Sequence, residues 1–185
     1  MRITGGHLGG RKLATPPDNS IRPTSDKVRQ AIFNILCHQD YGFTLAGART
    51  ADLFAGTGAM GIEAISQGAS FCLFVEDAAE SRALIQRNIE ALGLTGVTKI
   101  FRRDATKLGK MAAASGGPFD LVFLDPPYRK DLIAPALASL REGGWLAPNA
   151  LIIAETGENE IVAVENFETL DERIYGETRV TFLRA

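Results

Sequence analysis

The sequence is poor in the residues that mark secreted, metal-binding and membrane proteins. Its 185 residues include only two cysteines, Cys37 and Cys72, and two histidines, His7 and His38. The cysteines lie far apart in apolar segments, which favours buried thiols in a reducing compartment over a disulfide. The histidines lie in different segments, so we expect no metal site. No apolar run approaches the roughly 18 residues of a membrane span, and the first residues lack the apolar core of a signal peptide. We therefore expect a cytoplasmic protein without membrane contact.

Net charge is also small, and this argues against a generic nucleic-acid binder. The chain has 20 Lys and Arg against 22 Asp and Glu, which gives a net charge of −2. The distribution is uneven, because residues 1–30 carry six basic and two acidic residues. A basic first segment ahead of an acidic body fits an arm that meets phosphates, and it fits a solvated tail equally well.

Short apolar runs alternate with helical patterns from residue 49 onward. The runs are RTADLF, FCLFVE, VTKIFR, FDLVFLD and ALIIAE. Such runs are typical of parallel strands covered by helices on both faces, and the helical segments between the first three runs end at Gly68 and Gly93. The tail DERIYGETRVTFLRA predicts an antiparallel hairpin. We therefore expect a doubly wound α/β sheet, mostly parallel, with ligands bound at the carboxyl ends of its strands.

The first 48 residues have a different pattern. Residues 1–20 are rich in Gly and Pro and contain two β-prone pieces, Arg2–Thr4 and Arg11–Ala14. They predict a small N-terminal β-hairpin extension, separate from a domain that spans residues 21–185. The next segment, RPTSDKVRQAIFNIL, predicts a helix capped by Thr24 or Ser25.

Three of the predicted strand ends carry residues that suit a nucleoside. Gly56, Gly58 and Gly61 match the pattern G-x-G-x-x-G between a strand and a helix, where glycine permits a tight turn and close approach of a ligand. Glu76 lies 18 residues after Gly58, where an acid accepts hydrogen bonds from ribose hydroxyls, and Asp104 is placed to accept from an adenine amine. A tight turn and a solvated helix cap are the plain structural alternatives. The pattern fits both an NAD-dependent dehydrogenase and an S-adenosylmethionine methyltransferase.

The fourth strand end, in LVFLDPPYRK, distinguishes between these two enzymes. Asp125 supplies a carboxylate, Pro126 a carbonyl fixed by the following ring, and Tyr128 an aromatic face, while Pro127 has no N–H. The exocyclic amine of a base requires two acceptors for its hydrogens and a ring on which to stack. This segment therefore predicts methyl transfer to a planar amine, with these four residues as the catalytic group. A proline-stiffened loop with a packing tyrosine is the structural alternative.

Five segments resemble, in order, the RsmD family of 16S ribosomal RNA guanine-N2 methyltransferases. They are MRITGG…GRKL, RPTSDKVRQAIFNIL, DLFAGTGAMGIEA, FLDPPY and YGETR, and the likeness covers nearly the whole chain. The resemblance implies a Rossmann-like methyltransferase fold, S-adenosylmethionine as cofactor, S-adenosylhomocysteine as product and no metal. It implies as substrate a guanine of 16S ribosomal RNA in an assembling or assembled small subunit. Tyr128 is a departure, since some family members carry Phe at this position.

The resemblance also assigns residues to the cofactor and to RNA. Gly56, Thr57 and Gly58 would lie against the methionine part, Glu76 on the ribose, and Asp104 with Ala105 at the adenine. Asp52 and Asp125 would favour the cationic sulfonium. The complete implied cofactor set is Thr24, Asp52, Ala55, Gly56, Thr57, Gly58, Glu76, Asp104, Ala105 and Asp125. The implied RNA-binding set is Arg2, Arg11, Lys12, Arg22, Arg129 and Lys130.

Several alternatives stay open from the sequence. Arg22 would either close over the cofactor or bind a phosphate, and Arg129 and Lys130 would either meet phosphates or face solvent. A DNA adenine or cytosine amino-methyltransferase would share the site, although 185 residues leave little room for a target-recognition region. A non-catalytic RNA-binding module is the third candidate. Nothing in the sequence requires more than a monomer.

Overall fold

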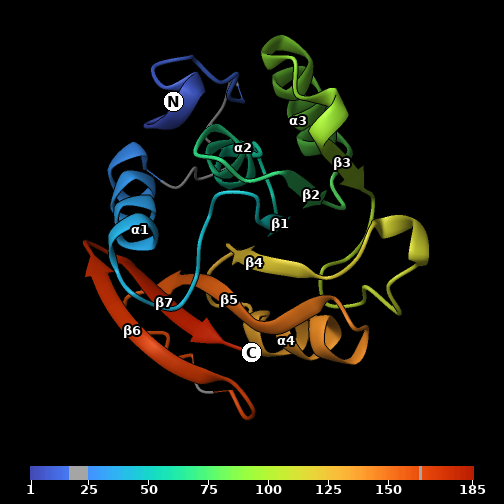
Figure 1. Cartoon of the computed structure of the whole chain (residues 1–185). Coiled ribbons are helices and arrows are strands. Elements are labelled where there is room, and N and C mark those ends of the chain that lie inside the picture. Colours follow the sequence, from blue (N-terminus) through green and yellow to red (C-terminus); the bar gives the residue numbers. More distant parts are fainter. Residues whose placement is uncertain (17–24, 163) are drawn as a thin grey trace.

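The protein is built around a seven-stranded sheet with strand order β3-β2-β1-β4-β5-β7-β6 (Figure 1). The computed structural model describes residues 1–16, 25–162 and 164–185, so the predicted site residues Arg22 and Thr24 lie outside the described residues. The strands are β1 (Arg49–Leu53), β2 (Phe71–Val75), β3 (Thr98–Phe101), β4 (Phe119–Leu124), β5 (Leu146–Gly157), β6 (Glu168–Tyr175) and β7 (Thr178–Arg184). Strands β1 to β5 pair in parallel, and β7 runs antiparallel to both of its neighbours. The expected mostly parallel sheet with an antiparallel C-terminal hairpin is confirmed.

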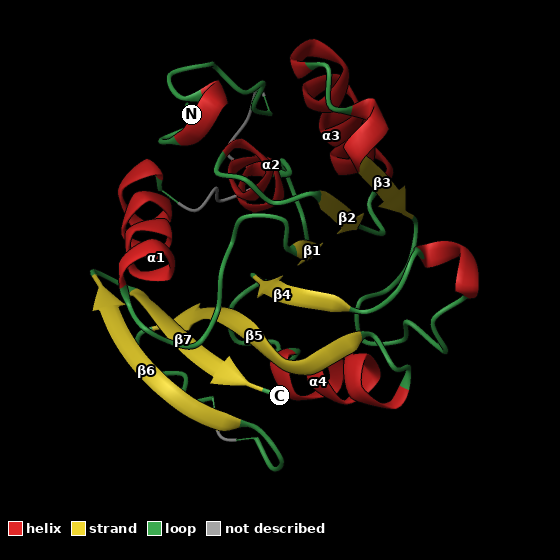
Figure 2. Cartoon of the chain, in the orientation of Figure 1, coloured by secondary structure: helices red, strands yellow, loops and turns green. Residues whose placement is uncertain are grey.

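Helices cover both faces of this sheet (Figure 2). They are α1 (Asp26–His38), α2 (Ala59–Ser66), α3 (Ala79–Leu92) and α4 (Ile133–Glu142), with short 3-10 turns at Gly6–Leu8, Thr95–Val97 and Ala113–Ser115. Helices α1, α2 and α3 pack on one face and α4 on the other. None of the helices within the described ranges has the length and hydropathy needed to cross a bilayer.

The alternation of side chains along β4 supplies both cores. Leu121 and Phe123 face α1 to α3, whereas Val122 and Leu124 face α4. All four side chains are buried, and burial of each such side chain stabilises the fold by about 1.5–3 kcal/mol. A strand that is apolar on both faces must be covered on both faces, which is why this part of the sequence reads as a continuous apolar run.

The predicted helix boundaries follow from local chemistry. The Ser25 hydroxyl accepts the Val28 N–H at 3.2 Å, so Ser25 is the N-cap of α1. Gly68 and Gly93 follow α2 and α3 with φ of 116° and 71°, a left-handed conformation that glycine adopts without strain. In each case the next amide bonds back five residues, from Ala69 to Ala64 and from Leu94 to Ile89. Both predicted C-terminal glycines are therefore confirmed.

The N-terminal segment forms a hairpin that packs on the body of the protein. Arg2 pairs with Lys12 in an antiparallel bridge, and the 3-10 turn Gly6–Leu8 lies at its tip. Ile3, Leu8 and Leu13 are buried in the same core as α2. The predicted boundary at residue 20 stays a prediction, because residues 17–24 are outside the described ranges.

Glycine at position 6 permits the close contact between this hairpin and α2. Its φ is 73°, and a Cβ built there would lie 1.8 Å from the carbonyl oxygen of Ser66. The Ser66 hydroxyl in turn donates to the Gly5 carbonyl and accepts the Leu8 N–H. Backbone approach of this kind is possible only without a side chain.

A buried ion pair fastens the hairpin to both α1 and α2. Arg29 Nε donates to Glu63 Oε2 at 3.1 Å, and both side chains are 0% exposed. The Glu63 carboxylate also accepts the N–H groups of Thr4 and Gly5, each at 2.8 Å, and the side-chain amide of Gln67 at 2.9 Å. Arg29 donates further to the Arg2 carbonyl. A buried carboxylate is tolerated because all of these donors compensate it.

The structure corrects one expectation about the cysteines. Cys72 is buried as predicted, whereas Cys37 is exposed near the end of α1. The preceding apolar residues misled the prediction, because Leu36 faces the core while the next position on the helix turns outward.

The buried ion pair generates a stability prediction. We expect Glu63→Gln to lower the free energy of unfolding by about 1.5–3 kcal/mol, because the buried Arg29 charge loses its fully buried partner and keeps the half-exposed Asp26. Urea unfolding followed by circular dichroism measures the loss. Glu90→Gln removes an exposed carboxylate on α3 and should change stability by no more than about 0.5 kcal/mol. Equal stability of the two variants would contradict the role given to Glu63.

Candidate active site

A cleft of about 840 Å³ lies at the carboxyl ends of the parallel strands. Its walls come from the ends of β1, β2, β4 and β5, from the start of α1 and from the turn between β6 and β7. A crevice at this edge of an open α/β sheet is the expected location of a ligand site.

Most of the residues predicted for catalysis and cofactor binding line this cleft. They are Asp52, Ala55, Gly56, Thr57, Glu76, Asp125, Pro126, Pro127 and Tyr128. Gly58 follows Thr57 in the sequence and is the N-cap of α2. The cleft wall does not include Asp104, Ala105, Arg129 or Lys130.

Each glycine of the G-x-G-x-x-G segment has a distinct structural role. Gly56 and Gly58 adopt left-handed φ of 55° and 77°, which forms the tight turn. A Cβ at Gly61 would lie 2.4 Å from both Cys72 Sγ and a carbon of the Phe74 ring, so glycine lets α2 pack directly on β2. The last glycine therefore serves helix–strand packing and the first two serve the loop.

Two amides of this loop already bond to the protein. The Gly56 N–H donates to Glu76 Oε2 at 2.9 Å, and the Gly58 N–H donates to the Ala55 carbonyl at 2.7 Å. The other Glu76 oxygen accepts the Ala78 N–H at 2.9 Å. A dinucleotide site would use loop amides of this kind for a pyrophosphate, so this loop is poorly suited to one.

Acidic side chains dominate the charge of the cleft. The acids along its wall are Asp52, Glu76, Asp77, Asp125, Glu155 and Glu177, and the wall residues within the described ranges include no Lys, Arg or His. A site with this charge attracts a cation and repels phosphate.

Asp52 is an acid of the cleft with a perturbed pKa. Burial raises the pKa of Asp52 well above its ordinary value, and the negative charges of Asp125 and Glu76 raise it further. A hydrogen bond from the Gly61 N–H at 2.9 Å opposes this rise. The protein thus holds a carboxyl group where ionisation is costly, which is a feature of functional sites.

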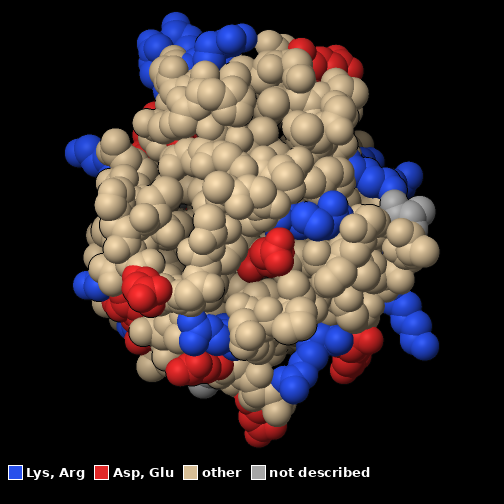
Figure 3. All heavy atoms as spheres, in the orientation of Figure 1, with Lys and Arg blue, Asp and Glu red and all other residues tan. Residues whose placement is uncertain are grey.

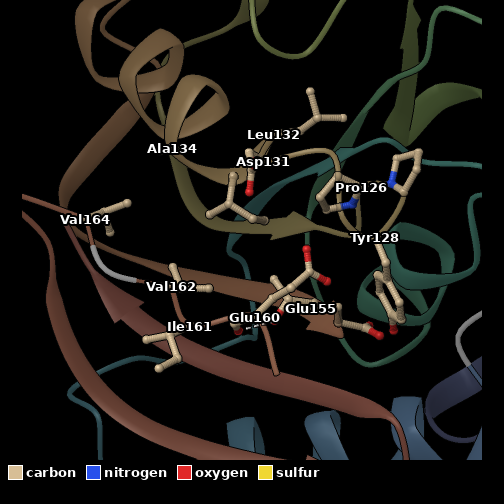
Figure 4. A pocket seen from close by; sticks show the side chains of 13 residues that line it. Pro126, Tyr128, Asp131, Leu132, Ala134, Glu155, Glu160, Ile161, Val162 and Val164 are labelled. Atoms are coloured by element: carbon tan, nitrogen blue, oxygen red, sulfur yellow. Dashed lines mark hydrogen bonds between the residues drawn. The ribbon is translucent and has the colours of Figure 1, made fainter. Parts of the chain in front are cut away.

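The loop after β4 presents Tyr128 between two cavities. The tyrosine hydroxyl lies 3.0 Å from the Thr178 hydroxyl at the start of β7. Pro126, Pro127, Tyr128 and Glu155 line both the large cleft and a smaller pocket of about 120 Å³ behind the loop (Figure 4). The hydroxyl that distinguishes Tyr128 from Phe therefore has a defined neighbour across the cleft.

Asp104 has its own local partners. Its Oδ1 accepts both the N–H and the hydroxyl of Thr106, at 2.8 and 2.7 Å, and these bonds lower the pKa of the carboxyl group. The side chain is exposed, and neighbouring Ala105 is packed in the α4 core. The role of both residues at an adenine stays a prediction.

The structure also brings residues to the cleft to which the sequence gave no role. Glu155 near the end of β5 is 3% exposed, and the turn Tyr175–Thr178 closes the far side. Glu155 ends the run ALIIAE, so its position at a strand end was a readable signal. Phe54 adopts a left-handed φ of 60° without being glycine, and no sequence signal marks it.

The basic residues predicted to bind RNA that lie within the described ranges are exposed. Arg2, Arg11 and Lys12 lie on the outer side of the N-terminal hairpin, and Arg129 and Lys130 lie beside the DPPY segment. Figure 3 shows basic side chains gathered at the corner where this hairpin lies, while the middle of that face carries acidic and basic side chains close together.

The hairpin and the glycine loop are connected through Asn88 of α3. Asn88 is 3% exposed, and its Nδ2 donates to the carbonyls of Ala14 and Thr57 at 3.2 and 3.1 Å. Its Oδ1 accepts the Ala14 N–H at 2.8 Å. One buried amide thus links the outer segment to the floor of the cleft.

Comparison with known proteins supplies the family. The family described as conserved hypothetical protein 95 matches residues 1–184. A relative from Escherichia coli strain K12, named ribosomal RNA small subunit methyltransferase D, is 36% identical over 180 residues, which cover 96% of this chain and 86% of the relative. A relative of the same name from Haemophilus influenzae is 32% identical over 181 residues, which cover 95% of this chain and 89% of the relative.

A solved structure agrees with this match. The protein yhhF from Escherichia coli aligns with a TM-score of 0.83 and 30% identity, covering 100% of this chain and 97% of that chain. Sequence and fold therefore agree over the full length, and the chain belongs to the conserved hypothetical protein 95 family, which is the RsmD family that its motifs predict.

Proposed function

We propose that the protein transfers a methyl group from S-adenosylmethionine to the exocyclic N2 amine of a guanine in small-subunit ribosomal RNA. The observation that carries the proposal is the acid-lined cleft at whose edge Asp125, Pro126, Pro127 and Tyr128 stand. The names of the two relatives support ribosomal RNA as the substrate. The reaction would take place in the cytoplasm, on an assembling or assembled small subunit, with the enzyme as a monomer.

The charge of the cleft fits this cofactor better than a dinucleotide. The sulfonium of S-adenosylmethionine is a cation, so its binding beside Asp52 and Asp125 would favour the ionised forms of these acids, which burial and mutual repulsion disfavour at Asp52. In the proposed pose Gly56 and Thr57 contact the methionine part, with Ala55 and Gly58 completing the loop.

The remaining cofactor contacts follow the family pattern. Glu76 accepts from the ribose hydroxyls, because a carboxylate that already bonds two amides retains further lone pairs. Asp104 and Ala105 contact the adenine, and Thr24 closes the site from the start of the first helix.

The chemical step is a displacement in line with the carbon–sulfur bond. The guanine nitrogen forms a bond to the methyl carbon while the bond from that carbon to sulfur breaks, and S-adenosylhomocysteine leaves with a neutral sulfur. Asp125 and the Pro126 carbonyl accept the two amine hydrogens, and Tyr128 stacks on the flipped base. The surplus proton passes to Asp125 or to water.

RNA would be held by the exposed cations on either side of the cleft. Arg2, Arg11 and Lys12 would contact phosphates from the hairpin, and Arg129 and Lys130 those that flank the flipped nucleotide. Arg22 would join either this surface or the cofactor site.

The decisive assay supplies labelled S-adenosylmethionine and small ribosomal subunits, followed by digestion of the RNA and identification of the nucleoside. We expect the label on guanine N2. We expect Asp125→Ala to reduce transfer by about 100-fold or more, because the amine loses one of its two acceptors, while the cofactor still binds, about tenfold more weakly because one acid near the sulfonium is lost. Label on adenine or on DNA would favour the DNA methyltransferase alternative, and no label on any substrate would favour the RNA-binding module.

Asp52 provides a test through pH. Because its pKa is raised in the folded state, the charge destabilises the fold increasingly as pH rises above the ordinary value of about 3.9. We expect Asp52→Asn to be more stable than the wild type at pH 8, by about 1.4 kcal/mol or more, and equally stable near pH 4. Urea unfolding at both pH values measures this difference.

The same variant separates charge from shape in cofactor binding. We expect Asp52→Asn to bind S-adenosylmethionine about tenfold more weakly, with a smaller change for S-adenosylhomocysteine because its sulfur is neutral. Asp77→Asn, which removes an exposed acid from the same cleft, serves as the control. Equal weakening of both ligands would argue against a sulfonium contact.

The hairpin cations are tested by salt dependence. We expect Arg11→Ala and Lys12→Ala each to weaken RNA binding and to lower the slope of log affinity against log salt by about 1. Affinity for S-adenosylhomocysteine should not change. Arg173→Ala on β6, an exposed arginine at the far edge of the sheet, is the control. Unchanged slopes for the two hairpin variants would remove this surface from the RNA-binding proposal.

A further inference from the structure

The turn that follows Thr156 packs behind the catalytic loop. The Glu160 N–H donates to the Gly157 carbonyl at 2.9 Å, and the Thr156 hydroxyl donates to the Glu160 carbonyl at 3.0 Å. These bonds fix the backbone of the turn. Figure 4 shows Glu160 extending from the β5 side of the smaller pocket toward the loop that carries Pro126 and Tyr128.

The carboxylate of Glu160 bonds to both sides of this junction. Its Oε1 accepts the Arg129 N–H at 2.7 Å, and its Oε2 accepts the Gly157 N–H at 2.7 Å. Hydrogen bonds to an ionised acceptor are shorter and stronger than neutral ones. One side chain thus connects the end of β5 to the residue that follows Tyr128.

The local backbone requires such support. Arg129 and Asp131 have φ of 60° and 51°, in the left-handed region that residues with a Cβ rarely adopt. Backbone of this kind persists only where surrounding contacts hold it. Gly157 leaves room for the contact, since a Cβ there would lie 2.7 Å from Glu160 Oε2 and 3.7 Å from the Tyr128 ring.

Tyr128 is therefore restrained at two points. Its hydroxyl lies 3.0 Å from the Thr178 hydroxyl, and the amide of the next residue is bonded to Glu160. The first contact limits the position of the ring tip, and the second fixes the backbone beyond it. Together they define the plane in which a base would stack.

We propose that Glu160 is a positioning residue for methyl transfer, which holds the Asp125–Arg129 loop in the geometry that the target amine requires. The inference rests on the proposed function and adds a residue to it that lies outside the large cleft. Glu160 acts through the loop and does not itself contact the reacting atoms. Because transfer in line tolerates little displacement, loss of this support affects the chemical step more than cofactor binding.

The kinetic test compares Glu160→Ala, Glu160→Gln and the wild type with small ribosomal subunits as substrate. We expect kcat to fall by roughly 10- to 100-fold in Glu160→Ala, with KM for S-adenosylmethionine within about twofold. Glu160→Gln keeps one carbonyl oxygen and so one of the two bonds, and it should lie between the others. Glu158→Gln, which neutralises an exposed carboxylate in the same turn, should match the wild type.

A measurement without substrate keeps this inference separate from the proposed function. Hydrogen exchange at the Arg129 amide should be slow in the wild type and in Glu158→Gln, and faster by about tenfold or more in Glu160→Ala at unchanged global stability. An unprotected Arg129 amide in the wild type would overturn the inference, and so would an unchanged kcat in Glu160→Ala. A wild type with slow exchange at Arg129 but no transfer to any RNA would instead count against the proposed function alone.

Discussion

The site depends on one constraint, which is that parallel strands end at the same edge of a sheet. That edge brings together Asp52, Glu76, Asp125 and Glu155, which are far apart in the sequence. Mutual repulsion and burial make this arrangement costly, as the raised pKa of Asp52 indicates. A cationic ligand is attracted by these carboxylates and reduces the repulsion between them, and both effects favour its binding. The fold therefore gathers negative charge in the cleft, and the cationic sulfonium of the proposed cofactor would compensate it.

Much of this edge was predictable because the relevant signals are local. The glycine pattern after β1, the acid after β2 and the DPPY segment after β4 each follow an apolar run. Parallel pairing of these strands places the three segments at the same edge of the sheet. The helix ends at Gly68 and Gly93 were predictable for the same reason, since a left-handed residue after a helix favours glycine. Glu155 also ends an apolar run, but this position predicts a place in the cleft only once β5 is known to lie beside β4.

The remainder depends on contacts that no short stretch encodes. Glu63 lies in an apolar segment, where a lone acid suggests a solvent-facing position, yet its partners come from the hairpin and from α1. Glu160 likewise lies in a turn that resembles ordinary loop sequence until the bond to Arg129 is seen. The left-handed φ of Phe54 and of Arg129 has no sequence signal, because neither residue is glycine, Asn or Asp. In each of these cases, contacts between segments far apart in the sequence determine the conformation or the position of the residue.

The bond from Thr4 to Glu63 has a consequence for the order in which the protein acquires its structure. The two residues are 59 positions apart, so the hairpin docks on a partner that is synthesised much later. Closing a loop of that length costs chain entropy before any contact repays it. The backbone hydrogen bonds within the hairpin are local, such as that from the Ile3 N–H to the Arg11 carbonyl, but its docking on the body requires α2. A partly folded chain would therefore present these cations on an undocked hairpin, and their fixed position against the body would depend on α2.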